Sequence, residues 1–243
     1  SDPRKAPAVL LTIAFVEEAF GAWHVRGGLG TLATSLESRL SDLGCQIHLN
    51  SKVDRILTDL GEARGIELSD GARHQADIVI SNVDAYLLYG SMLPEIKETK
   101  RARALLKRAT PSLSGFSLQL SLRGKSNLSH HSVFFPEDYE DEFEAIFTRK
   151  EPVPDPAIYI CNAPGMTKNP NDESWFVLIN APRHDENFDW DRPGLKDEYA
   201  ERIIDLMEKR GLSVRSRLVE MKVRTPADLE RDVAAPGGSI YGT

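Results

Sequence analysis

The sequence predicts a mixed α/β (α+β) fold, in which helices cover sheets built from antiparallel strands. Two helices are indicated by apolar residues at helical spacing within residues 29–43 and 195–211. A strand is indicated by uninterrupted alternation within residues 116–122. Between residues 45 and 80 the pattern predicts consecutive strands with no crossover helix. The 243 residues suit one large or two small domains.

A glycine-rich stretch, residues 21–30, precedes the first of these helices. Its Gly27-Gly28 pair lets the backbone approach a neighbour that any side chain would block. Leucines at helical spacing behind it predict a helix with one face in the core, and Gly44 predicts its end. The glycine spacing differs from the dinucleotide-binding fingerprint. On the residues alone, a tight turn and a ligand cradle both stay open.

The segment after this helix is predicted to contain four strands. They are residues 45–49, 53–57, 66–68 and 76–80. A turn at residues 59–62 separates the second strand from the third, and Asp70-Gly71 is a strong hairpin signal. The fourth is an apolar run typical of a strand buried on both faces.

The same two periodicities predict the remaining elements. They are helices at residues 94–109, 138–148 and 195–211, strands at 116–122, 158–160, 175–179 and 214–223, and a helix starting at Thr225. Pro226 at the first helical position favours that helix start. The apolar run at residues 8–16 predicts a core helix or strand, and it is too short to span a membrane. The acidic run 137–144 predicts a solvated helix face.

Composition and titratable residues narrow the classes of function. A net charge of −7 argues against a nucleic-acid partner, which needs a clustered basic face. Cys45 and Cys161 lie in apolar contexts and predict buried thiols in a reducing, cytoplasmic compartment. His130 and His131 are adjacent, so a strand would point them to opposite faces, and no carboxylate or cysteine lies at ligand spacing. No metal site is therefore predicted, and packing or hydrogen bonding is the favoured role of both histidines.

Several motifs occur in the collinear order of one family. They are Phe20-Gly21-Ala22-Trp23, Arg26-Gly27-Gly28-Leu29-Gly30, Leu49-Asn50-Ser51, Val53-Asp54-Arg55-Ile56, Ala76-Asp77-Ile78-Val79-Ile80-Ser81-Asn82, His130-His131, Phe176-Val177-Leu178-Ile179-Asn180-Ala181-Pro182 and Pro236-Gly237-Gly238-Ser239-Ile240-Tyr241-Gly242. With these motifs the chain resembles the carotenoid (phytoene-type) desaturases, within the FAD-dependent amine-oxidase-like flavoproteins. The resemblance implies an FAD/NAD(P)-binding-like flavoprotein fragment, with an antiparallel-sheet substrate domain and covering helices.

The resemblance also implies how the chain is divided. Residues 1–27 would belong to the substrate domain, 28–85 to the FAD-binding domain, 86–232 to the substrate-binding domain, and 233–243 would return towards the FAD-binding domain. The family's opening strand, glycine-rich turn and helix are not recognised, nor is its C-terminal FAD segment. The chain is therefore expected to be a partial one, inactive by itself, and FAD binding by this chain alone is in question.

The implied activity is oxidation of a lipophilic polyene by FAD, as in phytoene desaturation, with peripheral membrane contact by the intact enzyme. The implied cofactor-binding residues are Arg26, Gly27, Gly28, Val53, Ser81 and Asn82, and the implied substrate-binding residues are Phe20, Trp23 and Tyr241. No catalytic residue is identified. A position near the cofactor is favoured for Ser81 and Asn82 over the alternative that they cap a turn at the end of a strand.

Other roles stay open for single residues and for the whole protein. Trp23 could staple the first segment to the core, and Arg26 could form a salt bridge with Glu17 or Glu18. A lipid or prenyl carrier of the GDP-dissociation-inhibitor type would need a similar apolar tunnel without flavin chemistry. A flavin-dependent carotenoid isomerase is a third reading of the same resemblance. Flavin bound by the intact protein would separate the carrier from the two enzymes.

Overall fold

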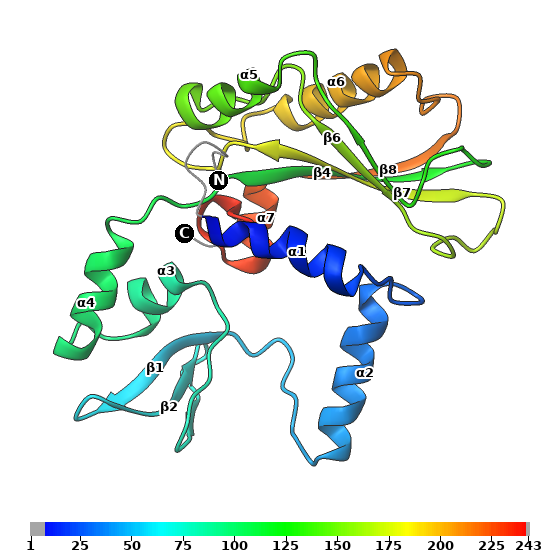
Figure 1. Cartoon of the computed structure of the whole chain (residues 1–243). Coiled ribbons are helices and arrows are strands. Elements are labelled where there is room, and N and C mark those ends of the chain that lie inside the picture. The colour runs from blue at the N-terminus through cyan, green and yellow to red at the C-terminus, as the bar shows by residue number, and fades with distance from the viewer. Residues whose placement is uncertain (1–7, 242–243) are drawn as a thin grey trace.

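The computed structural model describes residues 8–241 and contains two antiparallel sheets (Figure 1). The strands are β1 (Val53–Asp59), β2 (Glu62–Leu68), β3 (Arg73–Gln75), β4 (Ser114–Leu122), β5 (His131–Phe134), β6 (Ile158–Asn162), β7 (Glu173–Ala181) and β8 (Leu218–Arg224). The three-stranded sheet has the order β1-β2-β3, and the five-stranded sheet has the order β5-β6-β7-β4-β8. The predicted mixed α+β class with antiparallel sheets is therefore confirmed. The ends of predicted segments 1–27 and 233–243, including Gly242 of the last motif, lie outside the described residues.

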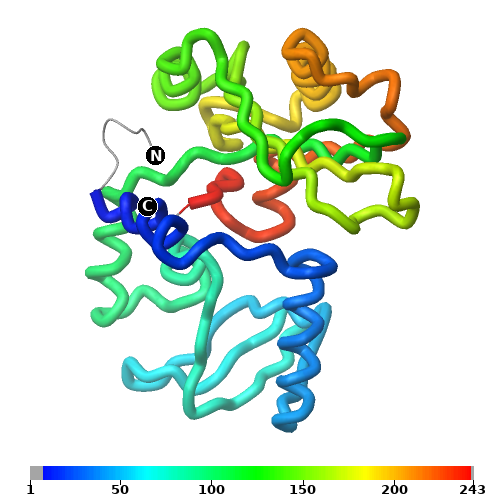
Figure 2. Tube along the Cα trace, turned by 45° about the vertical axis from the view of Figure 1, so that its right-hand side comes forward, coloured from blue at the N-terminus to red at the C-terminus, as the bar shows by residue number. Residues whose placement is uncertain are grey.

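The helices divide between the two sides of the five-stranded sheet. They are α1 (Leu11–Phe20), α2 (Leu29–Asp42), α3 (Ala85–Leu87), α4 (Lys97–Leu106), α5 (Tyr139–Phe143), α6 (Leu195–Lys209) and α7 (Pro226–Val233). Shorter helical turns cover Ala8–Leu10, Leu88–Met92, Glu144–Arg149 and Pro236–Gly238. In Figures 1 and 2, α5 and α6 lie above the sheet, whereas α1, α2 and the three-stranded sheet lie below it. Within residues 8–241, every helix is too short or too polar to cross a bilayer.

The main core lies between the five-stranded sheet and α6. Strand β4 is its centre, because Phe116, Leu118, Leu120 and Leu122 alternate along it and are all at most 1% exposed. The inward face of α6 is the one that the helical spacing predicts. Its buried residues are Leu195, Tyr199, Ala200, Ile203, Ile204 and Met207. The apolar face of β4 therefore packs against the apolar face of α6 in one layer. Burial of these side chains is the main source of stability in such a domain.

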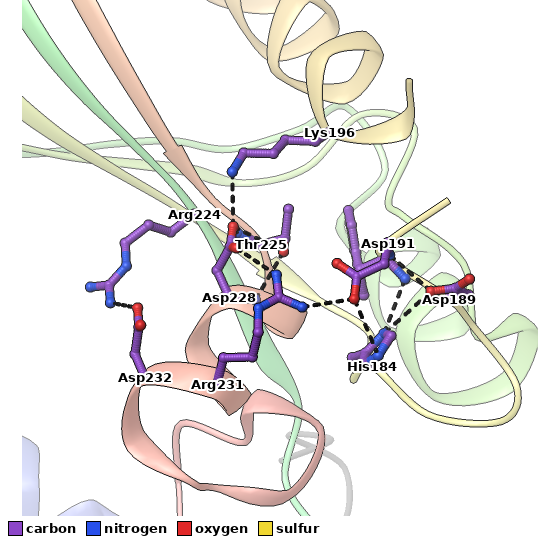
Figure 3. Close-up of polar contacts among 10 residues, drawn as sticks. His184, Asp189, Asp191, Lys196, Arg224, Thr225, Asp228, Arg231 and Asp232 are labelled. Atoms are coloured by element: carbon purple, nitrogen blue, oxygen red, sulfur yellow. Dashed lines mark hydrogen bonds and ion pairs between the residues drawn. The ribbon is translucent and has the colours of Figure 1, made fainter. Parts of the chain in front are cut away.

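A network of charged side chains fixes α7 against α6 (Figure 3). Thr225 caps α7, since its hydroxyl accepts a hydrogen bond from the Asp228 N–H at 3.1 Å. The Asp228 carboxylate in turn contacts Lys196 of α6 at 3.0 Å and Arg231 at 2.7 Å. Burial alone would raise the pKa of Asp228, but the hydrogen bonds from Thr225, Lys196 and Arg231 hold it well below its usual range. Arg231 extends the network to Asp191 at 2.7 Å.

A buried carboxylate, Glu173, is the first residue of β7 and joins the loops around the start of that strand. Its oxygens accept hydrogen bonds from the Ser126 N–H and the Asn162 amide at 3.0 Å, and from the Trp175 indole at 3.1 Å. Arg217 completes the set with an ion pair at 2.7 Å, and the two charged side chains are 4% and 14% exposed. Burial acts to raise the pKa of Glu173, but the hydrogen bonds from Ser126, Arg217 and Asn162 outweigh it and lower the value to about 2.

Two predicted strands are wrong. Residues 45–49 and 76–80 form no strand, and in the second segment Ile78 and Ile80 are 79% and 92% exposed. The run of apolar residues identifies a segment suited to a sheet but does not supply a neighbouring strand to pair with. Among the described residues the three-stranded sheet ends at β3, so neither segment has such a neighbour.

The predicted core face of α2 is also wrong for this structure. The helix occupies the predicted span, but Leu32, Leu36 and Leu40 are exposed, and α2 buries no residue. Helix α1 is likewise exposed along its length, contrary to the prediction of a core element at residues 8–16. Amphipathic spacing specifies which face is apolar, whereas burial requires a packing partner, and no described residue covers these faces.

Two further predictions fail on single side chains. Cys45 is exposed rather than buried, because it follows α2 in a segment that joins no sheet; Cys161 is half-buried in β6. Glu142 of the acidic run is fully buried instead of solvated. It accepts hydrogen bonds from the Ala157 N–H at 2.6 Å and the Asn180 amide at 2.8 Å, and burial raises its pKa in spite of them.

Replacing Glu173 should destabilise the fold strongly. Glu173→Gln leaves Arg217 buried without its anionic partner, so we expect the free energy of unfolding to fall by about 3 kcal/mol. The measurement is urea denaturation of the full-length protein. Glu201→Gln is the control, because Glu201 pairs with Arg215 on the exposed surface and should cost less than about 0.5 kcal/mol. Equal losses for the two variants would contradict this role of Glu173.

The same carboxylate should make stability depend on acid pH. Its pKa is about 2 in the folded state and about 4.3 when unfolded. Its stabilisation is therefore complete above the unfolded pKa and is lost as the pH falls through the folded pKa. We expect the stability difference between the wild type and Glu173→Gln to shrink by roughly half between about pH 5 and pH 3. A difference that stays constant over this interval would exclude Glu173 as the titrating group.

Candidate active-site cavity

The face of the five-stranded sheet that points away from α6 carries a mixed row of side chains. Strand register places Lys222, Gln119, Phe176, Cys161 and His131 opposite one another, one from each strand. Because side chains alternate along a strand, all of these positions lie on one face. A second row lies on the same face, two residues closer to the start of β4. It contains Arg224, Ser117, Leu178, Tyr159 and Val133.

A cavity of about 850 Å³ lies between this face and residues 22–29. Its lining residues from the segment between α1 and α2 are Ala22, Trp23, His24, Val25, Gly28 and Leu29. From the sheet and its loops come Gln119, Leu120, Ser121, His130, His131, Tyr159, Cys161, Ala163, Met166, Ser174, Trp175, Phe176, Glu220 and Lys222. Most of the lining surface is apolar, with a few polar groups, which is the usual character of a small-molecule site.

The glycine pair lets residues 22–29 turn back towards the sheet. Gly27 and Gly28 have φ angles of 82° and 84°, a region that residues with a Cβ rarely adopt. The Gly28 N–H donates to the Val25 carbonyl at 2.9 Å, which closes the turn. A Cβ at Gly28 would lie 3.3 Å from Met166 Sδ, in the loop between β6 and β7. The glycines therefore serve both the turn and the close approach of this segment to the loop.

Three histidines gather at one end of the cavity. The rings of His130 and His131 stack with their centroids 4.2 Å apart, and His24 meets His130 edge-on at 4.8 Å. The Nδ1 atom of His131 lies 2.7 Å from the Tyr159 hydroxyl. Burial, followed by the neighbouring His131 and His24, lowers the pKa of His130. Nearby Cys161 is the cross-strand partner of His131.

The prediction that the two histidines point to opposite faces is therefore wrong. His130 precedes β5, so the alternation of strand side chains does not apply to it, and its ring turns to the same side as that of His131. The expected lack of a cysteine partner is wrong for a related reason. Cys161 is distant in sequence from both histidines, and strand pairing brings it beside them.

A second cavity of about 390 Å³ lies beside β1 and β2. Its lining residues are Val53, Ile56, Ile66, His74, Ala76, Ile78, Val79, Ile80, Ser81, Asn82, Val83 and Met92. Three of the predicted cofactor-binding residues, Val53, Ser81 and Asn82, thus share one hollow although they come from separate segments. Residues 76–80 are not part of a strand here, although the Ala76 N–H donates to the Arg64 carbonyl of β2 at 3.1 Å.

The predicted site residues fall into three places. Trp23 and Gly28 line the large cavity, although Trp23 is 88% exposed, and its indole donates to the Phe20 carbonyl at 3.1 Å. Arg26 and Gly27 adjoin that cavity in sequence without lining it. Phe20 and Tyr241 are exposed and line neither cavity. All nine residues therefore stay predictions. Five of them line a cavity, two the large one and three the small one.

Other cavity residues were missed by the sequence analysis. The most prominent are Gln119, Tyr159, Cys161, Met166 and Phe176. Part of the signal was present, because the alternation that marks the buried residues of 116–122 also marks Ser117, Gln119 and Ser121 for the opposite face. Which residues of the other strands lie beside them depends on register, which the sequence pattern does not give.

The start of α2 has the properties of a site for an anionic or electron-rich group. Gly28 is its N-cap, and no side chain bonds to its first N–H groups, which leaves donors and the positive end of the helix dipole available. A Cβ at Gly27 would lie 2.7 Å from Thr31 Oγ1, so this position accepts no side chain without a shift. Within residues 8–241, no ion pair joins Arg26 to Glu17 or Glu18, so the salt-bridge alternative finds no support there. This donor set fits part of FAD.

Known proteins resemble this chain along its length. The 4,4'-diaponeurosporene oxygenase of Staphylococcus aureus (strain USA300) is 31% identical over 98% of this chain and 48% of its own length. The 4,4'-diapolycopene oxygenase of Methylomonas sp is 29% identical over 100% of this chain and 49% of its own. The chain thus spans about half the length of the curated relatives that it matches.

A solved structure and a family pattern agree with these relatives. The crystal structure of an oxidoreductase from Methanosarcina mazei has a TM-score of 0.50 and 16% identity, over 81% of this chain and 42% of that one, and supports the fold. The sequence pattern of the flavin containing amine oxidoreductases matches residues 5–211. The chain belongs to the flavin containing amine oxidoreductase family.

Proposed function

We propose that this chain is part of an FAD-dependent oxidoreductase that oxidises a long polyene of the carotenoid class. The observation that carries the proposal is the cavity of about 850 Å³ between the open sheet face and the glycine segment, with its largely apolar lining. It lies next to the uncapped start of α2, where the donor set fits part of FAD. The named substrates of the curated relatives support a polyene over other apolar ligands.

The residues of this chain would bind and orient the polyene. Trp23 and Phe176 offer aromatic surface from the two opposite walls of the cavity, and Leu29 and Met166 add apolar contact beside the glycine turn. Such walls exclude water from the reacting carbons, which strengthens any electrostatic interaction in the cavity. FAD, when bound, supplies the capacity to accept a hydride. Cofactor contacts would come from Arg26, Gly27 and Gly28 here, and from the small cavity in the three-stranded sheet region.

Desaturation is the reaction that the sequence resemblance favours. One hydride would leave one carbon for the flavin, one proton would leave the adjacent carbon, and a new double bond would form between the two. Titratable groups lie at both ends of the described part of the cavity, where a departing proton could be accepted: His130, His131 and Tyr159 at the β5 edge, and Glu220 and Lys222 on β8.

Oxygenation of a polyene end is the second candidate. The observation in its favour is that the two relatives described above are named as oxygenases. The two reactions differ in their products. Desaturation removes two hydrogen atoms, whereas oxygenation adds oxygen to the substrate. Mass spectrometry of the product separates them.

Access from a lipid bilayer is part of the proposal, since a polyene of this kind dissolves in membranes. Peripheral contact by the intact enzyme would let the substrate enter without passing through water. Helix α1 offers apolar surface for such contact, because Leu11, Ile13 and Phe15 are all more than half exposed. Sedimentation of the full-length protein with lipid vesicles tests this point.

The enzyme is expected to lose polyene turnover when its cavity becomes charged. Phe176→Asp places a carboxylate on the apolar wall, so we expect kcat/KM for a C30 or C40 polyene to fall at least about tenfold, equal to about 1.4 kcal/mol. The variant should keep its flavin absorbance through gel filtration, because Phe176 lies on the substrate side. Val219→Asp is the control, since Val219 is an exposed strand residue outside the cavity.

Two results would contradict the proposal. Unchanged turnover in Phe176→Asp would remove the cavity from the reaction. A well-folded full-length wild-type protein that retains no flavin would favour the lipid-carrier alternative instead.

A further inference from the structure

We propose that His130, His131 and Cys161 bind a zinc ion at one end of the large cavity. The ligand atoms of these three residues all lie within 4.8 Å of one another. This inference goes beyond the flavin chemistry of the proposed function and does not depend on it. It also reverses the prediction from the sequence that the histidine pair holds no metal.

The fold places the three residues together by strand pairing. His131 and Cys161 are cross-strand partners on β5 and β6, so their side chains leave the sheet on the same face. The pairing continues to His130, whose carbonyl accepts a hydrogen bond from the Asn162 N–H at 2.8 Å. The rings of His130 and His131 lie next to each other in a nearly parallel stack. Two imidazoles and a thiol are thus gathered at one edge of the sheet, and one ring must rotate out of the stack for both nitrogens to face a single ion.

The donor set selects the metal. Two imidazole nitrogens and one thiolate sulfur suit zinc and other late transition metals, whereas magnesium and calcium require oxygen ligands. Zinc bonds of about 2.1 Å to nitrogen and 2.3 Å to sulfur require ligand atoms roughly 3.4–3.7 Å apart. The side chains must therefore close by about 1 Å around the ion, which a change of torsion at the exposed His131 allows. Binding converts the Cys161 thiol to a thiolate and releases one proton to solvent.

A supporting residue is already in position. Tyr159 Oη lies 2.7 Å from Nδ1 of His131, which leaves Nε2 as the nitrogen free for a metal. Hydrogen bonds of this kind orient ligating histidines in metal sites. His24 stands edge-on to His130 from the opposite wall of the cavity. Three protein ligands and a fourth position that opens to the cavity are the arrangement of a zinc site with an exchangeable ligand.

The other cluster of this kind in residues 8–241 makes a poorer site. His184, Asp189 and Asp191 also bring their ligand atoms within 4.8 Å. However, Asp191 already pairs with Arg231 at 2.7 Å, and His184 Nδ1 accepts a hydrogen bond from the Trp190 N–H at 3.2 Å (Figure 3). A metal there would have to compete with Arg231 for the Asp191 carboxylate. In the Cys161 cluster the thiol contacts the neutral Tyr159 hydroxyl, so no charged partner has to be displaced.

Cobalt and zinc binding to the reduced full-length protein test the proposal. We expect one Co²⁺ per chain with a thiolate-to-cobalt charge-transfer absorption in the near ultraviolet, and its displacement by Zn²⁺. Cys161→Ser should abolish the charge-transfer band, and His131→Ala should weaken binding at least about a hundredfold. Tyr159→Phe, which removes only the supporting hydroxyl, should weaken binding about tenfold.

Matched controls separate this site from adventitious binding. Cys45→Ser removes the other cysteine of the chain, which is exposed and far from these histidines in sequence, and should leave the cobalt spectrum unchanged. His48→Ala removes one ring of the second histidine pair, His48 and His74, and should also have no effect. A wild-type protein that is folded and reduced but shows no thiolate–cobalt band would overturn the proposal. Equal zinc affinity in Cys161→Ser and wild type would do the same. Flavin retention and polyene turnover are read separately, so failure of the proposed function leaves this result intact.

Discussion

The alternation of side chains along β4 is the constraint on which the rest of the structure depends. Phe116, Leu118, Leu120 and Leu122 point to one face, where α6 covers them and forms the main core. The residues between them must then point to the other face. Because β4 pairs with both β7 and β8, its register also decides which of their residues lie beside Gln119. The strand thus fixes the core and the cavity wall at the same time.

One buried carboxylate and one half-buried carboxylate preserve this arrangement where the regular elements end. Glu173 holds the loops around β7 through Arg217 and through hydrogen bonds from groups on three separate segments. Asp228 joins α7 to α6 next to the opposite end of β4 (Figure 3). Each carboxylate keeps its charge despite burial because several donors surround it. The cavity therefore has a rigid wall, the sheet, and a second wall that is a loop shaped by Gly27 and Gly28.

Much of the fold could be predicted from the sequence, and the rest failed for identifiable reasons. The alternation of 116–122, the inward face of α6 and the Thr225-Pro226 cap are local patterns, and the structure confirms all three. The strands expected at 45–49 and 76–80 failed because strand pairing is not a local property. The candidate site was predicted mainly from the family resemblance, which gave Trp23 and Gly28 in the large cavity. Tyr159, Cys161 and Phe176 could not be predicted, since only register brings them together.

The central claim is that the open face of the five-stranded sheet binds the polyene. Photo-crosslinking tests it most directly, with a long polyene analogue that carries a diazirine at one end, the full-length protein with its flavin, and peptide mapping of the adducts. The account predicts adducts on residues 22–29 and on the open-face residues of β4, β6 and β7. Adducts confined to the exposed apolar face of α2, at Leu32, Leu36 and Leu40, would contradict it.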